Sequence, residues 1–332
     1  MTRGQWILAA ALAVQLLLLG LLSMGGDDRG ASEPRALIPD LEAFTPVRLE
    51  IDGAEGDPVA LRREGEGWVL DDPDGFPADG EKVEALLDKL EPLQVRRPVV
   101  TSSRYHGALE VADDAFKRRL RIWDRADGDP HVELYLGTSP SYETTHARSG
   151  GDDRVYEIRG LGTFDLRTER ASWIDRRLLD VDQDRLAGIT LRNEHGRLEL
   201  ARESGAWRLV SPAPRAGGEF DPEEAASWVR SVTSIFISEP GPKADSGGLG
   251  LDDPVATLEI RTRGEVPEGA PEDAEAPLET TTIRIGGPAN GDGDDGRRYA
   301  SRSGFGFAVV LSGFDVERFT GTRASDFHAS EE

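Results

Sequence analysis

Hydrophobic residues form one long run near the amino terminus, residues 6–24, which contains no charged side chain. A helix of about 19 residues spans roughly 28 Å, close to the hydrocarbon thickness of a bilayer. Arg3 precedes the run, whereas Asp27 and Asp28 follow it. Because positive charge favours the cytoplasmic side, the pattern predicts a cytoplasmic tail at residues 1–5, a single-pass signal anchor at 6–24 and an extracytoplasmic body. A cleaved signal peptide is the alternative interpretation of the same run.

The segment after this run has no hydrophobic periodicity. Residues 25–40 are rich in Gly, Asp, Ser, Arg and Pro, a composition typical of a flexible linker. We therefore expect the folded body to begin near residue 41.

Two segments of the body carry apolar residues at the i, i+3, i+4 and i+7 positions of a one-sided helix. The first begins at Asp79 and the second at Asp221, and either Asp can cap exposed backbone N–H groups. Pro222 and Glu224 add two further helix-start signals to the second segment. The apolar positions are Val83, Leu86, Leu87, Leu90 and Leu93 in the first segment and Ala225, Trp228, Val229, Val232 and Ile235 in the second. The pattern predicts one main amphipathic helix in each half of the body.

The two halves also match outside these helices. One constant spacing along the sequence relates Asp79 to Asp221, Leu93 to Ile235, and Pro98 to Pro240. Alternating apolar positions flank both helices and predict strands, one around Trp68 and one around Trp207. Meandering strands with a single helix favour an antiparallel sheet, because parallel crossovers require more helices. The predicted fold class is therefore α+β, with an N-terminal transmembrane helix followed by two repeated units, each a mostly antiparallel sheet with one main amphipathic helix.

The repeat sets the expected domain boundaries. We predict a first α+β repeat at residues 41–180 and a second at 181–328, which contains an acidic flexible insertion at 264–280. Trp68 and Trp207 occupy equivalent positions, so we expect both in the core. Trp173 lies near the boundary between the repeats, and we expect it to pack there.

Charge and composition exclude several classes of function. The 332-residue chain carries 62 acidic and 39 basic residues, a formal net charge of −23, and such a field repels nucleic acid. We therefore expect no nucleic-acid partner. The chain has no cysteine, which excludes disulfides, thiolate metal sites, a Cys nucleophile and a lipid-modified Cys.

Local motifs for catalysis or metal binding are missing from the sequence. The five histidines are scattered, and the acidic runs that begin at Asp180 and Asn290 lack the Gly and Glu of a calcium-binding loop. No GxSxG elbow, phosphate-binding loop or GxGxxG motif occurs. We assign no catalytic, cofactor-binding or metal-ligating residue and no cofactor, and we expect a protein that is not an enzyme.

Three features together resemble a known family. They are the amino-terminal apolar run, the paired Gly/Ala-Trp-x-Leu strands at 67–70 and 206–209, and the junction segment Trp173-Ile174-Asp175-Arg176-Arg177-Leu178-Leu179. The chain resembles DUF4340 domain-containing proteins, a bacterial membrane-anchored family of unknown function often found beside gliding-motility-type ABC transporter components. The resemblance implies a protein of the bacterial inner membrane, with its body in the periplasm or extracytoplasmic space, that acts with an ABC permease and its ATPase.

We expect a non-enzymatic, membrane-anchored accessory protein of such a transporter. The alternative is an envelope hydrolase or glycan-binding protein with a carboxylate-lined cleft between the repeats. The sequence leaves open the ligand, the oligomeric state, the cleavage of the N-terminal segment and the relative orientation of the two repeats.

Overall fold

The computed structural model describes residues 33–39, 41–212, 219–265, 276–289 and 295–328. The predicted tail at 1–5 and the predicted anchor at 6–24 lie outside the described residues. The same holds for most of the linker at 25–40 and most of the insertion at 264–280. The acidic run that begins at Asn290 also lies outside them.

The helices of the described chain are short and amphipathic, which corrects the predicted fold class. No helix among the described residues is long and apolar enough to cross a membrane. The longest, α3 (Pro222–Thr233), has 12 residues and spans roughly 18 Å, whereas the hydrocarbon core is about 30 Å thick. The prediction of a fold that begins with a transmembrane helix is therefore wrong for this structure, whose described part consists mostly of antiparallel sheets with three α-helices.

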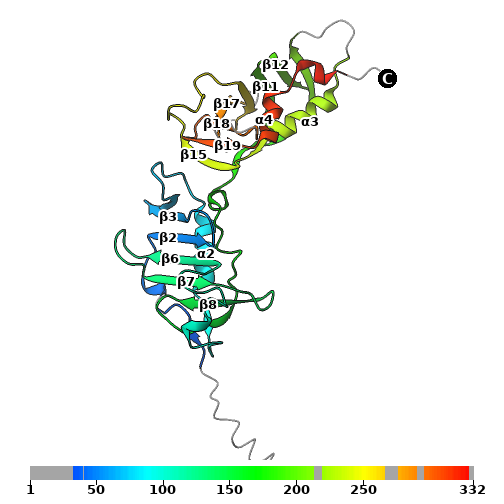
Figure 1. Ribbon diagram of the computed structural model, residues 1–332. Helices are drawn as coiled ribbons and strands as arrows, with labels where there is room; N and C mark the ends of the chain where they lie inside the picture. Colours follow the sequence, from blue (N-terminus) through cyan, green and yellow to red (C-terminus); the bar gives the residue numbers. More distant parts are fainter. Residues whose placement is uncertain (1–32, 40, 213–218, 266–275, 290–294, 329–332) are drawn as a thin grey trace, which may run out of the picture. The chain divides into compact units, whose positions relative to one another are not determined.

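The first large sheet has seven strands in the order β4-β3-β2-β6-β7-β8-β9. Figure 1 shows five of them, β3, β2, β6, β7 and β8, side by side in this order. The pairs β2–β3, β3–β4, β7–β8 and β8–β9 are all antiparallel. The strands are β2 (Arg48–Gly53), β3 (Val59–Glu64), β4 (Gly67–Leu70), β6 (Arg118–Trp123), β7 (Val132–Leu136), β8 (Thr144–Ser149) and β9 (Tyr156–Arg159).

The second large sheet has eight strands in the order β13-β12-β11-β16-β17-β18-β19-β15, and every neighbouring pair is antiparallel. Each sheet contains a meander of three consecutive strands, β2–β4 in the first sheet and β11–β13 in the second. The first strand of each meander also pairs with a strand from later in the chain, β6 or β16. The predicted duplication requires this shared arrangement. The internal repeat itself stays a prediction. The strands are β11 (Leu186–Asn193), β12 (Gly196–Glu203), β13 (Ala206–Ser211), β15 (Glu239–Lys243), β16 (Ala256–Arg263), β17 (Leu278–Pro288), β18 (Arg298–Arg302) and β19 (Phe307–Leu311).

The remaining strands and helices are short. Two small antiparallel pairs join β1 (Arg35–Ala36) to β5 (Gln94–Val95) and β10 (Arg177–Asp180) to β14 (Ser234–Phe236). The 3-10 helices are η1 (Leu41–Ala43), η2 (Ser103–Tyr105), η3 (Arg170–Trp173), η4 (Gln183–Arg185) and η5 (Ala324–Phe327).

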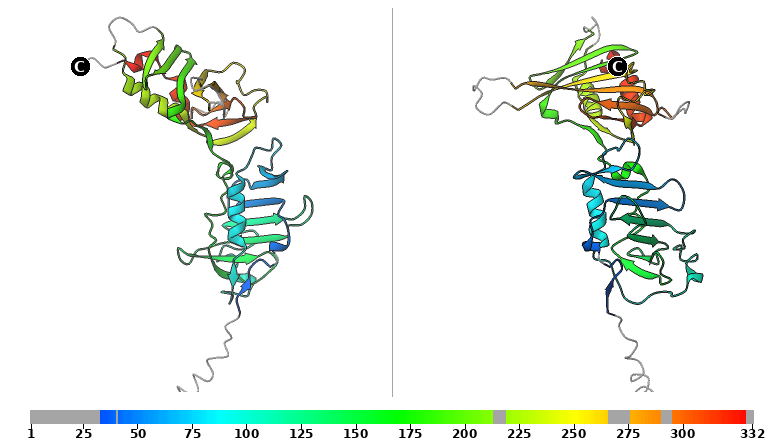
Figure 2. Two further views of the ribbon diagram at one scale, coloured as in Figure 1. Left: turned by 180° about the vertical axis from the view of Figure 1, so that it is seen from behind. Right: turned by 90° about the vertical axis from the view of Figure 1, so that its left-hand side faces the viewer.

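Three α-helices cover the sheets. Helix α2 (Gly80–Leu90) lies beside one face of the seven-stranded sheet (Figures 1 and 2). Helix α3 contacts β13, and α4 (Gly313–Thr320) contacts α3, β11 and β16. The eight-stranded sheet therefore carries two helices where the sequence predicted one. The eight residues of α4 form about two turns, too few to establish a hydrophobic period.

Contacts within the chain define two compact units. The first contains the described parts of residues 1–45, 86–121 and 130–166, and the second contains those of 46–85, 122–129 and 167–332. The predicted division at residues 180 and 181 stays a prediction. Trp68, Trp173 and Trp207 are all buried, which confirms that these three tryptophans pack in the interior.

Candidate functional site

The segment around Trp173 is fixed to the start of helix α2. The Trp173 side chain is only 4% exposed, and its Nε1 donates a hydrogen bond to the Arg167 carbonyl oxygen at 2.9 Å. The Trp173 carbonyl oxygen accepts a 2.7 Å hydrogen bond from the backbone N–H of Asp79. Lys82 Nζ donates to the Ile174 carbonyl oxygen at 2.6 Å. The junction segment therefore has a defined position in the second compact unit.

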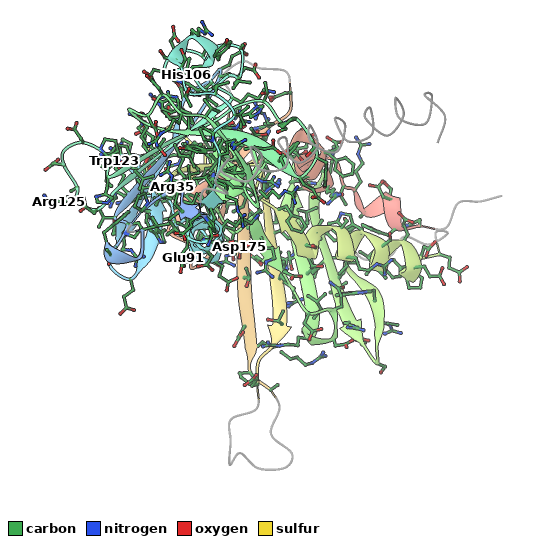
Figure 3. All side chains as sticks on the ribbon, turned by 90° about the horizontal axis from the view of Figure 1, so that it is seen from below. Arg35, Glu91, His106, Trp123, Arg125 and Asp175 are labelled. Carbon is green, nitrogen blue, oxygen red and sulfur yellow. The ribbon has the colours of Figure 1, made fainter. Side chains whose placement is uncertain are left out.

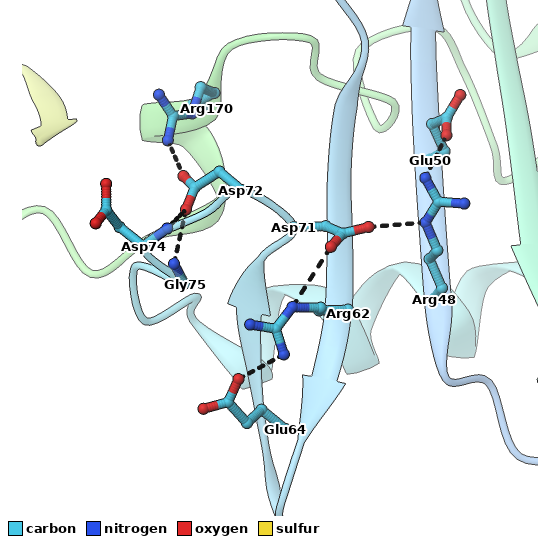
Figure 4. A network of polar contacts seen from close by, with 9 residues as sticks. All are labelled: Arg48, Glu50, Arg62, Glu64, Asp71, Asp72, Asp74, Gly75 and Arg170. Atoms are coloured by element: carbon cyan, nitrogen blue, oxygen red, sulfur yellow. Dashed lines mark hydrogen bonds and ion pairs between the residues drawn. The ribbon is translucent and has the colours of Figure 1, made fainter. Parts of the chain in front are cut away.

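A network of charged side chains holds the neighbouring loop that follows β4 (Figure 4). Asp72 Oδ1 accepts hydrogen bonds from the backbone N–H groups of Asp74, at 3.1 Å, and of Gly75, at 2.7 Å. Asp72 Oδ2 accepts from the guanidinium of Arg170, which belongs to η3. Gly75 has a positive φ of 66°, a conformation in which a larger side chain would be strained. This turn connects the loop to η3.

Asp71 fixes the other end of the loop to the sheet. Its carboxylate forms ion pairs with Arg48 at 2.9 Å and with Arg62 at 3.4 Å, both drawn in Figure 4. All three side chains are about one-third exposed or less, and the two pairs fix the position of the loop against β2 and β3.

The turn directs Phe76 into an aromatic cluster. Its side chain is 1% exposed, and its ring centroid lies 5.7 Å from that of Phe305 and 5.0 Å from that of Phe307. The first contact has an interplanar angle of 77°, the edge-to-face arrangement that aromatic rings favour. Phe76 and Phe305 form an apolar wall.

A cavity of about 220 Å³ lies against this wall and the junction segment. All of its lining residues belong to the second compact unit. The lining consists of Phe76, Pro77, Ala78, Asp175, Arg177, Leu178, Ile237, Arg302 and Phe305. Six of these nine residues are apolar and three are charged.

Two of these charges neutralise each other. Asp175, labelled in Figure 3, accepts hydrogen bonds from the backbone N–H of Arg177 at 3.0 Å and from the Arg177 guanidinium at 3.3 and 3.4 Å. Burial by itself would raise the pKa of Asp175, but these hydrogen bonds outweigh it and the pKa is lowered. Asp175 therefore stays ionised at neutral pH.

The third charge, Arg302, has no such partner. Among the described residues no carboxylate forms an ion pair with it; its Nη1 donates to the Leu178 carbonyl oxygen at 3.2 Å, and its guanidinium carbon lies 5.5 Å from the Phe305 ring centroid. Its Nε is buried and has no hydrogen-bond partner among the described residues. The cavity therefore has an excess of one positive charge.

The sequence analysis assigned no site residue, although it singled out one segment that lines this cavity. The junction segment, noted for its Trp-x-Asp-Arg-Arg-Leu-Leu pattern, supplies Asp175, Arg177 and Leu178. Arg302 and Phe305 carried no sequence signal, because they approach the junction only through the tertiary fold. A signal for Phe76 existed in the turn-forming residues Pro73 to Gly75.

The remaining sequence candidates have structural roles. The acidic run that begins at Asp180 places Asp182 at the start of η4, where its side chain accepts from the backbone N–H of Asp184 at 2.9 Å. His106 and His146 are both buried, in hydrogen bonds with the Asp153 carbonyl oxygen and Thr138 Oγ1 respectively. The described residues contain no group of three or more His, Cys, Asp or Glu side chains able to hold a metal ion.

Comparison with known proteins gives one match. The model of a family described as "Domain of unknown function (DUF4340)" matches residues 68–254. No curated protein and no solved structure matches the chain. The matched region contains the Trp173 segment and seven of the nine lining residues, and it ends before Arg302 and Phe305.

Proposed function

This chain belongs to the DUF4340 family, and from that premise we propose that it is a non-enzymatic accessory protein of the bacterial cell envelope that acts with an ABC-type permease and its ATPase. The resemblance of the chain to proteins found beside gliding-motility-type transporter components supports this role. The extracytoplasmic location rests on the sequence, in which Arg3 precedes the apolar run and Asp27 and Asp28 follow it.

The observation that carries the proposal is the chemistry of the cavity beside the Trp173 segment. A general acid or base needs a pKa near the operating pH, whereas the carboxylate in this lining, Asp175, has a lowered pKa and is paired with Arg177. Apolar walls with a few fixed charges are typical of binding sites. The lining therefore favours recognition of a partner over chemical transformation.

Crosslinking in intact cells tests the role. The tagged full-length protein is crosslinked, extracted in mild detergent and purified, and the co-purified proteins are identified by mass spectrometry. We expect an ABC permease and its ATPase to be enriched over the same purification from cells that carry an unrelated envelope protein with the same tag. Purification of the protein alone would contradict the accessory role.

A reporter fused to the carboxyl end tests the location. Alkaline phosphatase is active outside the cytoplasm, so we expect an active fusion. An inactive phosphatase fusion together with a fluorescent cytoplasmic reporter fusion would contradict an extracytoplasmic body.

A further inference from the structure

We propose that the cavity beside the Trp173 segment binds the carboxyl-terminal residue of a partner polypeptide, with Arg302 pairing the terminal carboxylate and the apolar walls enclosing an aliphatic side chain. This inference rests on the proposed accessory function, which requires a partner, and it names the part of the partner that is recognised.

The lining of the cavity contains one unpaired charge. Asp175 and Arg177 neutralise each other, with N···O distances of 3.3 and 3.4 Å, so the unpaired charge in the lining is that of Arg302. The whole chain has a net charge of −23. A cation in the lining that has no carboxylate partner among the described residues, in a chain with so many carboxylates, marks a place where an anion from outside is favoured.

Arg302 has one hydrogen-bond donor that lacks an acceptor among the described residues. Its Nη1 is engaged with the Leu178 carbonyl oxygen, whereas its Nε has no partner. The Nε and Nη2 edge of a guanidinium matches the two oxygens of a carboxylate, and this paired hydrogen bond is stronger than a neutral one. A small tilt of the guanidinium toward a bound carboxylate would give the buried Nε an acceptor.

The walls and the volume define the rest of the ligand. The apolar lining residues that stay accessible are Pro77, Ala78 and Phe305, whereas Phe76, Leu178 and Ile237 are almost completely buried; the accessible apolar surface favours an apolar group. The volume of about 220 Å³ is below the ~300–1,000 Å³ of pockets for drug-sized molecules. The cavity therefore suits a group of the size of one amino-acid residue.

A carboxyl-terminal aliphatic residue combines both requirements. It presents a carboxylate and an apolar side chain on the same Cα atom, whereas an internal Asp or Glu has only a short apolar stem. Capture of a terminal carboxylate is a recurring mode of peptide recognition. Leucine is the residue that we select as the probe.

The test uses the purified full-length chain and two matched probes, N-acetyl-leucine and N-acetyl-leucinamide, titrated by calorimetry. Both probes have the same apolar side chain, and only the first has a carboxylate. We expect the acid to bind about tenfold more tightly than the amide. Equal affinity of the two probes, or no binding of either, would overturn the proposal.

Substitution of Arg302 tests its role. Arg302→Gln should abolish the preference for the acid and leave the weak affinity for the amide unchanged, and Arg302→Lys should retain part of the preference because it keeps the charge without the paired geometry. Arg298→Gln is the matched control: Arg298 lies on the same strand, its Nη1 also donates to a backbone carbonyl oxygen, that of Gly286 at 3.0 Å, and it does not line this cavity. A preference that persists in both Arg302 variants would overturn the proposal, as would its loss in Arg298→Gln alone.

The experiments distinguish failure of the carboxylate proposal from failure of the accessory role. Recovery of permease and ATPase in the crosslinking experiment, together with equal binding of acid and amide, would remove the carboxylate proposal and leave the accessory role. Preferential binding of the acid without recovery of these proteins would remove the accessory role and leave the specificity of the cavity.

Discussion

His146 on β8 is a buried histidine whose environment disfavours protonation. Its side chain is 8% exposed, and its Nδ1 lies 2.7 Å from Thr138 Oγ1. Burial lowers the pKa of His146, although the charge of Glu157 acts in the opposite direction. As the pH falls below about 6.5, the unfolded chain therefore binds more protons at this position than the folded chain. The contribution of His146 to stability is complete above about pH 6.5 and is lost as the pH falls toward its lower folded-state pKa.

We predict that the free energy of unfolding of the wild-type protein falls as the pH is lowered below about 6.5, and that His146→Gln makes this fall shallower. Urea unfolding at several pH values measures both. Identical pH profiles for wild type and His146→Gln would contradict the assignment.

Arg148, also on β8, is a buried cation held by several groups. Its Nε donates to the Val111 carbonyl oxygen at 2.6 Å, its guanidinium pairs with Asp113, and its guanidinium carbon lies 4.2 Å from the Tyr135 ring centroid. The hydrogen bond from Arg148 lowers the pKa of Asp113. The planar guanidinium group makes these contacts at the same time, and the ammonium group of lysine cannot.

We predict that Arg148→Lys lowers the free energy of unfolding by about 1–3 kcal/mol, since the buried Val111 carbonyl oxygen loses its donor. Arg154→Lys is the control at an exposed ion pair, with Asp152, and should change the free energy of unfolding much less. Chemical denaturation measures both variants. Equal effects of the two substitutions would show that burial does not decide the contribution of Arg148.

The sequence predicted the positions of some residues in the fold but not of others. Trp68, Trp173 and Trp207 were predicted to pack in the interior because large apolar side chains within strands or at a junction need cover. Arg302 could not be predicted as a cavity residue, because a charged side chain at the end of a strand is usually solvated. Its position depends on which parts of the chain meet in the folded molecule.

At the scale of elements, helix α3 has the clearest local origin. Asp221 Oδ1 accepts hydrogen bonds from the backbone N–H groups of Glu223 at 2.9 Å and Glu224 at 3.1 Å, and Pro222 occupies the first turn. The sequence predicted this start. The buried residues of the helix, Ala225, Val229, Val232 and Thr233, lie on one face.

We predict that Asp221→Ala lowers the free energy of unfolding by about 1 kcal/mol, because two backbone N–H groups lose their acceptor. Asp221→Asn keeps an acceptor and should cost less. Asp253→Ala is the matched control at an exposed position for which the structure records no side-chain hydrogen bond. A loss in Asp253→Ala as large as in Asp221→Ala would contradict the capping role.

Other elements were not predicted correctly from the sequence. Helix α4 was missed because its eight residues show too little periodicity, although Ser312 caps it through a hydrogen bond from the backbone N–H of Asp315. The fold-class prediction included a transmembrane helix because of the apolar run at 6–24. The helices that the structure describes are all far shorter than that run, and they are amphipathic.

At the scale of the whole molecule, strand patterns predicted mostly antiparallel sheets, which the structure confirms. They could not predict the pairing of β11 with β16, because more than 60 residues separate these strands and local sequence does not specify distant partners. The cavity depends on such distant pairing, since Arg302 and Leu178 come from separate parts of the chain. The sequence alone therefore could not place Arg302 beside the junction segment.

The central claim is that this cavity joins the protein to its transporter partner. The most direct measurement is the amount of ABC permease and ATPase recovered by quantitative mass spectrometry after crosslinking in cells that express wild type, Arg302→Gln or Arg298→Gln at equal levels. We predict that recovery falls about tenfold for Arg302→Gln and stays at the wild-type level for Arg298→Gln. Equal recovery with all three proteins, or no recovery with wild type, would contradict the claim.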